Sequence, residues 1–248
     1  MRVPRITGTI DRRILANYRV DPATLARLLP APFRPQLVEN HAVAGICLIR
    51  LKHVRPSAVP GGWGLTSENA AHRFAVEWDT SEGTRSGVFI PRRDTNSALN
   101  ALVGGRLFPG VHHRAHFEVR ESENYYDVSM LANDRSARLR VAGQSYDGWP
   151  DGSLFRNATA ASDFFRGGAL GYSPARKAGV YDGLELSCRT WVTRALAVDT
   201  CESSFFEDRS LFPRGSVQFD NALLMIEIEH EWLGREMLSG SAPTANRA

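Results

Sequence analysis

The chain has 248 residues, enough for one large β-rich domain and too few for two well-formed ones. Its formal net charge is only +3, and its arginines are scattered among acidic residues, which indicates no nucleic-acid partner. The 3 cysteines are widely spaced and form no Cys-x-x-Cys pair, which argues against a disulfide framework and points to a reducing compartment.

The sequence carries no signal for a membrane or for export. Its start, "MRVPRITGTIDRR", lacks an apolar core of the kind found in signal peptides. The longest apolar run, residues 42–49, is far too short to span a bilayer. We therefore expect a cytoplasmic protein without a membrane partner.

Helical and strand signals alternate through the first half of the chain. The segment "DPATLARLL" predicts a short helix with Asp21 as N-cap, Pro22 in the first turn and an end at Pro30. Residues 41–54 are nearly all apolar and indicate a buried strand. Residues 71–90 alternate on both sides of "SEG", which is typical of a hairpin.

The second half continues the strand pattern. Strands are expected within 113–144, 184–198 and 222–233, and short helices within 96–105, 157–168 and 201–212. The end of the chain, residues 239–248, is expected to be a disordered tail after a domain of residues 1–238. The fold class expected is α+β: a single domain built on a large antiparallel β-sheet or closed β-barrel, with a few short helices.

Three segments together resemble the acetoacetate decarboxylase family. Residues 14–33 are similar to the strand, turn, leucine helix and Pro-x-Pro exit with which that family opens, and Arg19 lies in this turn. Residues 65–78 resemble the segment that carries an active-site glutamate, which falls on Glu68. "FIPRR" resembles the aromatic-Pro-Lys-Lys segment of the Schiff base, with Arg92 and Arg93 on the two lysines.

The likeness covers the first half of the chain well and the second half only in its strand pattern. It is closer still to uncharacterised bacterial relatives of that fold, which share "D-x-N" after the site strand and a return strand like "GRLFPGVHHRAHFEV". The resemblance implies the decarboxylase-like β-barrel fold. It also implies that Arg19, Arg92, Arg93 and Glu68 belong to a site.

The departure from the family pattern decides the expected chemistry. A Schiff base needs a neutral amine, whereas a guanidinium stays protonated and is no nucleophile. The only lysines, Lys52 and Lys177, lie outside the site segment. We therefore expect no imine chemistry. Two guanidiniums instead offer a planar clamp for a carboxylate, a phosphate or an enolate oxygen.

Adjacent residues of a strand point to opposite faces, so only one arginine of the pair faces a pocket unless the backbone turns at Pro91. By its place on the decarboxylase nucleophile we expect Arg92 to face inward, with Arg93 supporting it or pairing with Asp94. The alternative is structural: the run "RRDTN" begins a helix whose N-cap is Asp94, Thr95 or Asn96, and its arginines lie in solvent.

Glu68 and His72 share a strand face if the strand has begun at Glu68, and such a pair could move a proton. The structural alternative makes Glu68 a solvated turn residue and His72 a satisfied core histidine. A metal centre in "HHRAHFE" is not expected, because His112 and His116 lie about 13 Å apart at strand rise and His116 with Glu118 gives only two ligands.

The function expected is therefore a decarboxylase-like enzyme without the Schiff-base lysine. Arg92, Glu68 and His72 would carry acid/base and electrostatic catalysis, as a lyase, dehydratase, isomerase or cyclase, on a small oxo-acid, carboxylate or polyketide-like carbonyl compound. Arg93, Asp94, Asn96 and Arg19 would bind the substrate. No cofactor or metal is expected, and a homo-oligomer is possible. The alternative is a non-catalytic binding or sensing barrel.

Overall fold

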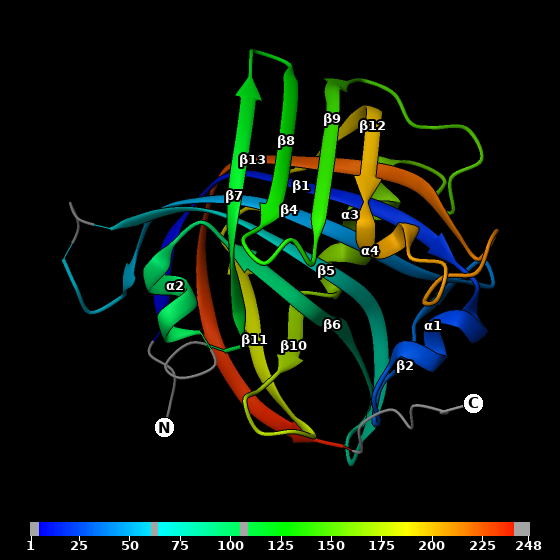
Figure 1. The fold of residues 1–248 in the computed structure, drawn as a ribbon, viewed down its shortest axis with the longest axis horizontal. Helices are drawn as coiled ribbons and strands as arrows, with labels where there is room; N and C mark the ends of the chain where they lie inside the picture. Colours follow the sequence, from blue (N-terminus) through cyan, green and yellow to red (C-terminus); the bar gives the residue numbers. More distant parts are fainter. Residues whose placement is uncertain (1–4, 61–63, 105–108, 241–248) are drawn as a thin grey trace.

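A computed structural model describes residues 5–60, 64–104 and 109–240 of the chain (Figure 1). In this part the order of elements is β1 (Ile6–Val20), α1 (Pro22–Leu28), β2 (Arg34–Pro35), β3 (Leu37–Val38), β4 (His41–Pro56), β5 (Leu65–Thr80), β6 (Gly83–Thr95), α2 (Ala98–Val103), β7 (His112–Glu121), β8 (Tyr125–Ala132), β9 (Arg138–Tyr146), α3 (Ala158–Gly167), β10 (Leu170–Pro174), β11 (Val180–Cys188), β12 (Arg194–Ser203), α4 (Ser204–Glu207) and β13 (Val217–Ser239).

All the strands belong to one 13-stranded sheet. Neighbouring strands are antiparallel except at β6, which pairs in parallel with β10 and with β7. The expectation of a single domain built on one large sheet with a few short helices is confirmed, and the sheet is mixed instead of purely antiparallel. Among the described helices, none has the length and apolar character needed to cross a bilayer.

The paired strands form two closed rings, a small one and a large one. Both rings include the shared strands, which are paired in the order β13, β1, β4, β5 and β6. β10 and β11 connect β6 back to β13 and complete the small ring. β7, β8, β9 and β12 connect the same two strands on the other side and complete the large ring. Figure 1 shows β7, β8, β9 and β12 above the shared strands and β10 and β11 below them.

Each shared strand is apolar on both faces. Ile14 and Ile46 lie in the main core, on the side of the large ring, whereas their neighbours Leu15 and Cys47 belong to a second cluster with Phe165 of α3. Successive side chains of a strand point to opposite faces, so one strand supplies both clusters. This explains why the sequence of β4 is nearly all apolar. It also means that each polar residue of these strands faces one ring or the other.

The helices begin where side chains can cap them. Asp21 accepts a hydrogen bond from the amide of Thr24 at 2.7 Å, which confirms it as the N-cap of α1. Ser97 accepts one from the amide of Asn100 at 3.2 Å and caps α2, so the proposed capping by Asp94, Thr95 or Asn96 is wrong. At the other end of the chain β13 includes Ser239, and the rest of the expected tail, 241–248, lies outside the described residues.

Three histidines lie where their charged forms are disfavoured. Burial and the neighbouring Arg92 lower the pKa of His72 to about 3. Burial and Arg93 lower the pKa of His112 to about 3, and burial lowers that of His230 to about 4. All three imidazoles are therefore neutral in the folded protein at neutral pH.

We expect the free energy of unfolding to rise with pH between about 4 and 6.5 and to level off above this range. Unfolded histidines have a pKa of about 6.5, so in this window the unfolded chain binds up to about three more protons than the folded chain. Each proton contributes a slope of about 1.4 kcal/mol per pH unit. Urea unfolding at a series of pH values measures the slope. His230→Asn should lower this slope by the contribution of one proton, about 1.4 kcal/mol per pH unit. A flat profile would contradict the burial of these rings.

Candidate active site

A cavity of about 350 Å³ lies inside the small ring, against one face of the shared strands. Its walls are mostly apolar and come from strands of the ring and from α3; they include Leu15, Ile49, Val88, Ile90, Phe165 and Leu184. The polar and ionisable side chains in its lining are Arg13, Cys47, Arg55, Asn69, Arg73, Arg93, Asp94, Asn100 and His112. The cavity therefore combines an apolar body with a cationic region.

Strand register brings the cationic residues together. Ala71 of β5 lies opposite Cys47 of β4 on one side and opposite Arg93 of β6 on the other. Arg73 follows Ala71 by two residues and so points to the same face. Arg13 reaches the same place from β1, where its Nε donates a hydrogen bond to Sγ of Cys47 at 3.3 Å. Three arginines from three strands thus surround one thiol.

None of these three arginines forms a salt bridge with a described residue, although Asp182 interacts electrostatically with Arg93. Within the described residues, no carboxylate lies within 4.0 Å of the guanidinium of Arg13, Arg73 or Arg93. Arg93 donates only from Nε, to Oγ of Ser173 at 2.9 Å. A fourth lining arginine, Arg55, donates to the backbone carbonyls of His53 in β4 and of Val59 after it. The described carboxylates therefore form no salt bridge with these three guanidiniums, and Asp182 offsets part of the charge of Arg93 from a greater distance.

Arg73 is the most buried of the three, with 4% of its surface exposed. Its guanidinium lies 4.4 Å from the ring centroid of Phe165 and donates to Oδ1 of Asn17, while its Nε has no partner in the described structure. Burial lowers the pKa of both Arg73 and Arg93 to about 10. Both side chains still carry a full charge at neutral pH.

His112 is the titratable ring of the cavity. Its Nδ1 lies 3.0 Å from the carbonyl oxygen of Gly110, which can only accept, so Nδ1 carries the proton. With the pKa lowered to about 3 by burial and by Arg93, the ring is neutral and Nε2 is its basic nitrogen. In the sequence, the pattern around His112 raised only the question of a metal ligand. The described residues contain no group of three or more His, Cys, Asp or Glu arranged to hold a metal.

Arg92 points away from the cavity. Its Nε and Nη2 bond to the carboxylate of Asp94 at 2.9 and 2.8 Å, and its Nη1 bonds to Oγ of Ser136. Asp94 borders the cavity, but its fully buried carboxylate is held by Arg92. The expectation that Arg92 is the inward residue is therefore wrong, because Arg93 faces the cavity.

A β-bulge at Pro91 reverses the expected orientation. His72 and Phe74 of β5 pair with Arg92 and Phe89 of β6, so the intervals differ by one residue and β6 carries the extra one. Val88 and Ile90 line the cavity, and in a regular strand position 92 would follow them. The extra residue moves the inward position to 93. Proline has no amide hydrogen for the ladder and is typical of bulges.

Glu68 and His72 share a face of β5, as expected, but this face belongs to the large ring. Glu68 accepts hydrogen bonds from Arg12, at 2.6 Å, and from Arg50, so it is neither solvated nor in the cavity. Nε2 of His72 lies 3.1 Å from Oγ of Ser203 inside the main core. The geometry makes the first an ion-paired residue and the second a core residue.

The two other expected binding residues also lie outside the cavity lining. Asn96 accepts a hydrogen bond from the amide of Glu68 at 3.0 Å and connects the ends of β5 and β6. Arg19 bonds to the carboxylate of Asp220 and to the carbonyl of Gly152. Of the seven residues predicted for the site, only Arg93 presents a polar side chain to the cavity without a salt bridge to a described residue.

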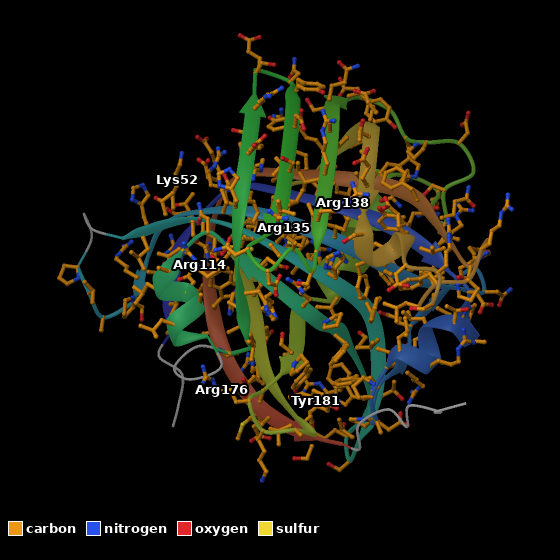
Figure 2. All side chains as sticks on the ribbon, in the orientation of Figure 1. Lys52, Arg114, Arg135, Arg138, Arg176 and Tyr181 are labelled. Atoms are coloured by element: carbon orange, nitrogen blue, oxygen red, sulfur yellow. The ribbon has the colours of Figure 1, made fainter. Side chains whose placement is uncertain are left out.

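Neither lysine lines the cavity. Lys52 pairs with Asp11 at 2.6 Å, and Figure 2 shows it at the periphery of the molecule. Lys177 borders a different hollow, formed between Leu28 and the connection from β10 to β11. The cavity lining therefore contains guanidiniums, an imidazole and a thiol, but no side-chain amine.

Adjacent substitutions should have opposite effects on stability. Arg92→Met leaves the buried Asp94 carboxylate unpaired, which should cost about 3 kcal/mol of unfolding free energy. Arg93→Met removes an uncompensated guanidinium from an apolar wall and should be neutral or stabilising by about 1 kcal/mol. Urea unfolding of both variants measures the difference. Equal losses would contradict the orientation given to the pair.

Solved structures of low sequence identity share the fold. Acetoacetate decarboxylase from Legionella pneumophila superposes with a TM-score of 0.62 at 12% identity, covering 96% of this chain and 88% of that chain. The enduracididine biosynthesis enzyme MppR, in complex with the condensation product of pyruvate and imidazole 4-carboxaldehyde, gives 0.62 at 13% identity, covering 96% and 90%. An acetoacetate decarboxylase-like enzyme from Sphingomonas wittichii RW1 gives 0.56 at 12% identity, covering 98% and 93%.

These superpositions show that the chain has the acetoacetate decarboxylase-like fold, as the resemblance in its first half implied. No curated protein sequence matches the chain. A family model described as an uncharacterized conserved protein matches residues 7–219, which is most of the chain and nearly all of its strands. The chain therefore belongs to the DUF2071 family.

Proposed function

We propose that the protein is an enzyme that binds a small anionic carbonyl compound in the small-ring cavity and acts on it without an imine. The observation that carries this proposal is the group of cavity arginines, Arg13, Arg73 and Arg93, none of which has a described carboxylate within 4.0 Å. Buried cations are costly unless they are paired. A bound carboxylate or enolate would supply the missing charge through short, charge-assisted hydrogen bonds.

The cavity also suggests the body of the substrate. Its volume of about 350 Å³ is within the range of small-molecule sites and exceeds what a three- or four-carbon oxo acid needs. Its walls beyond the arginines are aliphatic and aromatic, including Ile49, Leu184 and Leu186. The substrate class favoured is an oxo acid or related carboxylate with an apolar substituent. In support, MppR, which shares the fold, forms a complex with pyruvate, a 2-oxo acid.

Electrostatic catalysis would follow from the same arginines. A guanidinium at hydrogen-bonding distance from a carbonyl oxygen stabilises the negative charge that develops there on enolisation or addition. His112 is the residue of the lining suited to move a proton. Burial and Arg93 lower its pKa to about 3; a carboxylate bound to Arg93 would offset this repulsion and raise the basicity of Nε2.

Anion recognition gives a direct binding test. Phenylpyruvate should bind at least tenfold more tightly than pyruvate, because it adds apolar contact, and at least tenfold more tightly than its uncharged methyl ester. Arg93→Met should remove this preference for the acid, whereas Arg120→Met, which changes an exposed arginine of β7, should keep it. Isothermal titration measures the affinities. Equal binding of acid and ester by the unmodified chain would overturn the proposal.

A second experiment distinguishes catalysis from binding alone by measuring whether the bound acid undergoes a chemical change. Proton NMR of phenylpyruvate in deuterated water should show exchange of its C3 protons that depends on His112 and is lost in His112→Gln. Tight binding without exchange or any other conversion would favour a non-catalytic binding protein.

Borohydride trapping tests the absence of an imine and the identity of the inward residue. Oxo acid plus borohydride should leave the mass of the unmodified protein unchanged, because no amine lines the cavity. Arg93→Lys places an amine beside an apolar wall and near other guanidiniums, both of which lower its pKa, so we expect measurable trapping at mildly alkaline pH. Arg92→Lys should show none. Trapping in the unmodified chain would place Lys52 or Lys177 in the site.

A further inference from the structure

Cys47 occupies the middle of the cationic region and has no role in the function proposed above. It lies on β4 with 9% of its surface exposed, and it lines the cavity. Across β5, the small side chain of Ala71 separates it from Arg93 in one row of paired residues. Adjacent strands are about 4.8 Å apart, so the thiol and Arg93 belong to positions about 10 Å apart at the backbone.

The surroundings of this thiol are cationic on three sides. Arg13 donates to its Sγ at 3.3 Å, and the thiol interacts electrostatically with the guanidiniums of Arg73 and Arg93. Nε of Arg73, buried in the same wall, has no hydrogen-bond partner in the described structure. This donor could bond to an anionic ligand beside the thiol, whereas the unpaired Nε atoms of Arg12 and Arg19 belong to guanidiniums that already pair with carboxylates.

The two other cysteines have different environments. Cys201 lies 2.9 Å from the hydroxyl of Tyr18, and burial raises its pKa to about 11. Burial also raises the pKa of Cys188, and neither residue lines the cavity. All three thiols are free, so each serves as an internal reference for the others.

We propose that Cys47 is a nucleophile of the cavity for small carboxylates that carry an electrophilic carbon next to the carboxylate. The arginines bind the carboxylate and hold that carbon close to Sγ, which raises its effective concentration. With a 2-halo acid, Sγ forms a bond to the carbon, the carbon–halogen bond breaks, the halide leaves with the electron pair, and the thiol proton passes to solvent. The inference rests on the proposed function, since it uses the same anion site.

Selective alkylation tests the inference on the intact protein. Iodoacetate is an anion and iodoacetamide is its neutral counterpart, so the ratio of their rates at each cysteine reports recruitment by positive charge. Peptide mapping by mass spectrometry should show that this ratio at Cys47 is at least tenfold higher than for N-acetylcysteine. Cys201 should show no such preference, and Cys188, which interacts with Arg13 alone among these arginines, should show a smaller one. Pyruvate should slow the reaction of Cys47 with iodoacetate.

Matched variants show which residues cause the preference of Cys47 for iodoacetate. Arg73→Met and Arg93→Met should each lower the ratio at Cys47 about tenfold, and Arg120→Met should leave it unchanged. Cys47→Ser should abolish the fast labelling. The measurement on the unmodified chain is decisive even if a cavity variant does not fold: an iodoacetate preference no greater than that of N-acetylcysteine overturns the inference. If phenylpyruvate still binds through Arg93 in that case, the proposed function stands; if it does not bind, both fail.

Discussion

One extra residue in β6 decides which side chains meet the cavity. The shared strands are covered on both faces, so a shift of one position moves a side chain from one ring to the other. Before the bulge Val88 and Ile90 face the small ring, and after it Arg93 does, while Arg92 turns to Asp94. The position of the cation in the cavity, and hence the proposed anion site, depends on this irregularity at Pro91.

The arginines on the two faces of the shared strands differ in their ion pairs. On the large-ring face, Arg12 and Arg50 share the carboxylates of Glu68 and Glu121. On the small-ring face, Arg73 and Arg93 form no salt bridge with a described residue, and burial lowers their pKa although Asp182 opposes the shift at Arg93. A buried ion pair contributes little net stability, but an unpaired buried charge costs several kcal/mol. Such a cost is typical of functional sites, where binding of the substrate offsets it.

Sequence patterns predicted the strands, the β5–β6 hairpin and the Asp21 cap, because each depends on residues close together in the chain. They also pointed to the segment around Pro91, part of which borders the cavity. They failed on the orientation of Arg92, because alternation in the sequence does not show where a bulge inserts a residue. Arg13 and Arg73 were missed for a different reason: they meet in the cavity only through strand pairing across β1, β4 and β5.

An arginine cannot perform both tasks of a Schiff-base lysine. A lysine with a lowered pKa can bind a carbonyl compound covalently, whereas an arginine can only hold an anion. Any covalent step in this cavity therefore needs a nucleophile from another strand. Cys47 can be this nucleophile, because the residue between it and Arg93 in the row of paired residues is Ala71, whose side chain is small. The spacing of about 10 Å between the two backbone positions leaves room for a carboxylate and its neighbouring carbon between the side chains. Anchor and nucleophile thus lie on different strands, held at a distance that the hydrogen-bonded ladder fixes.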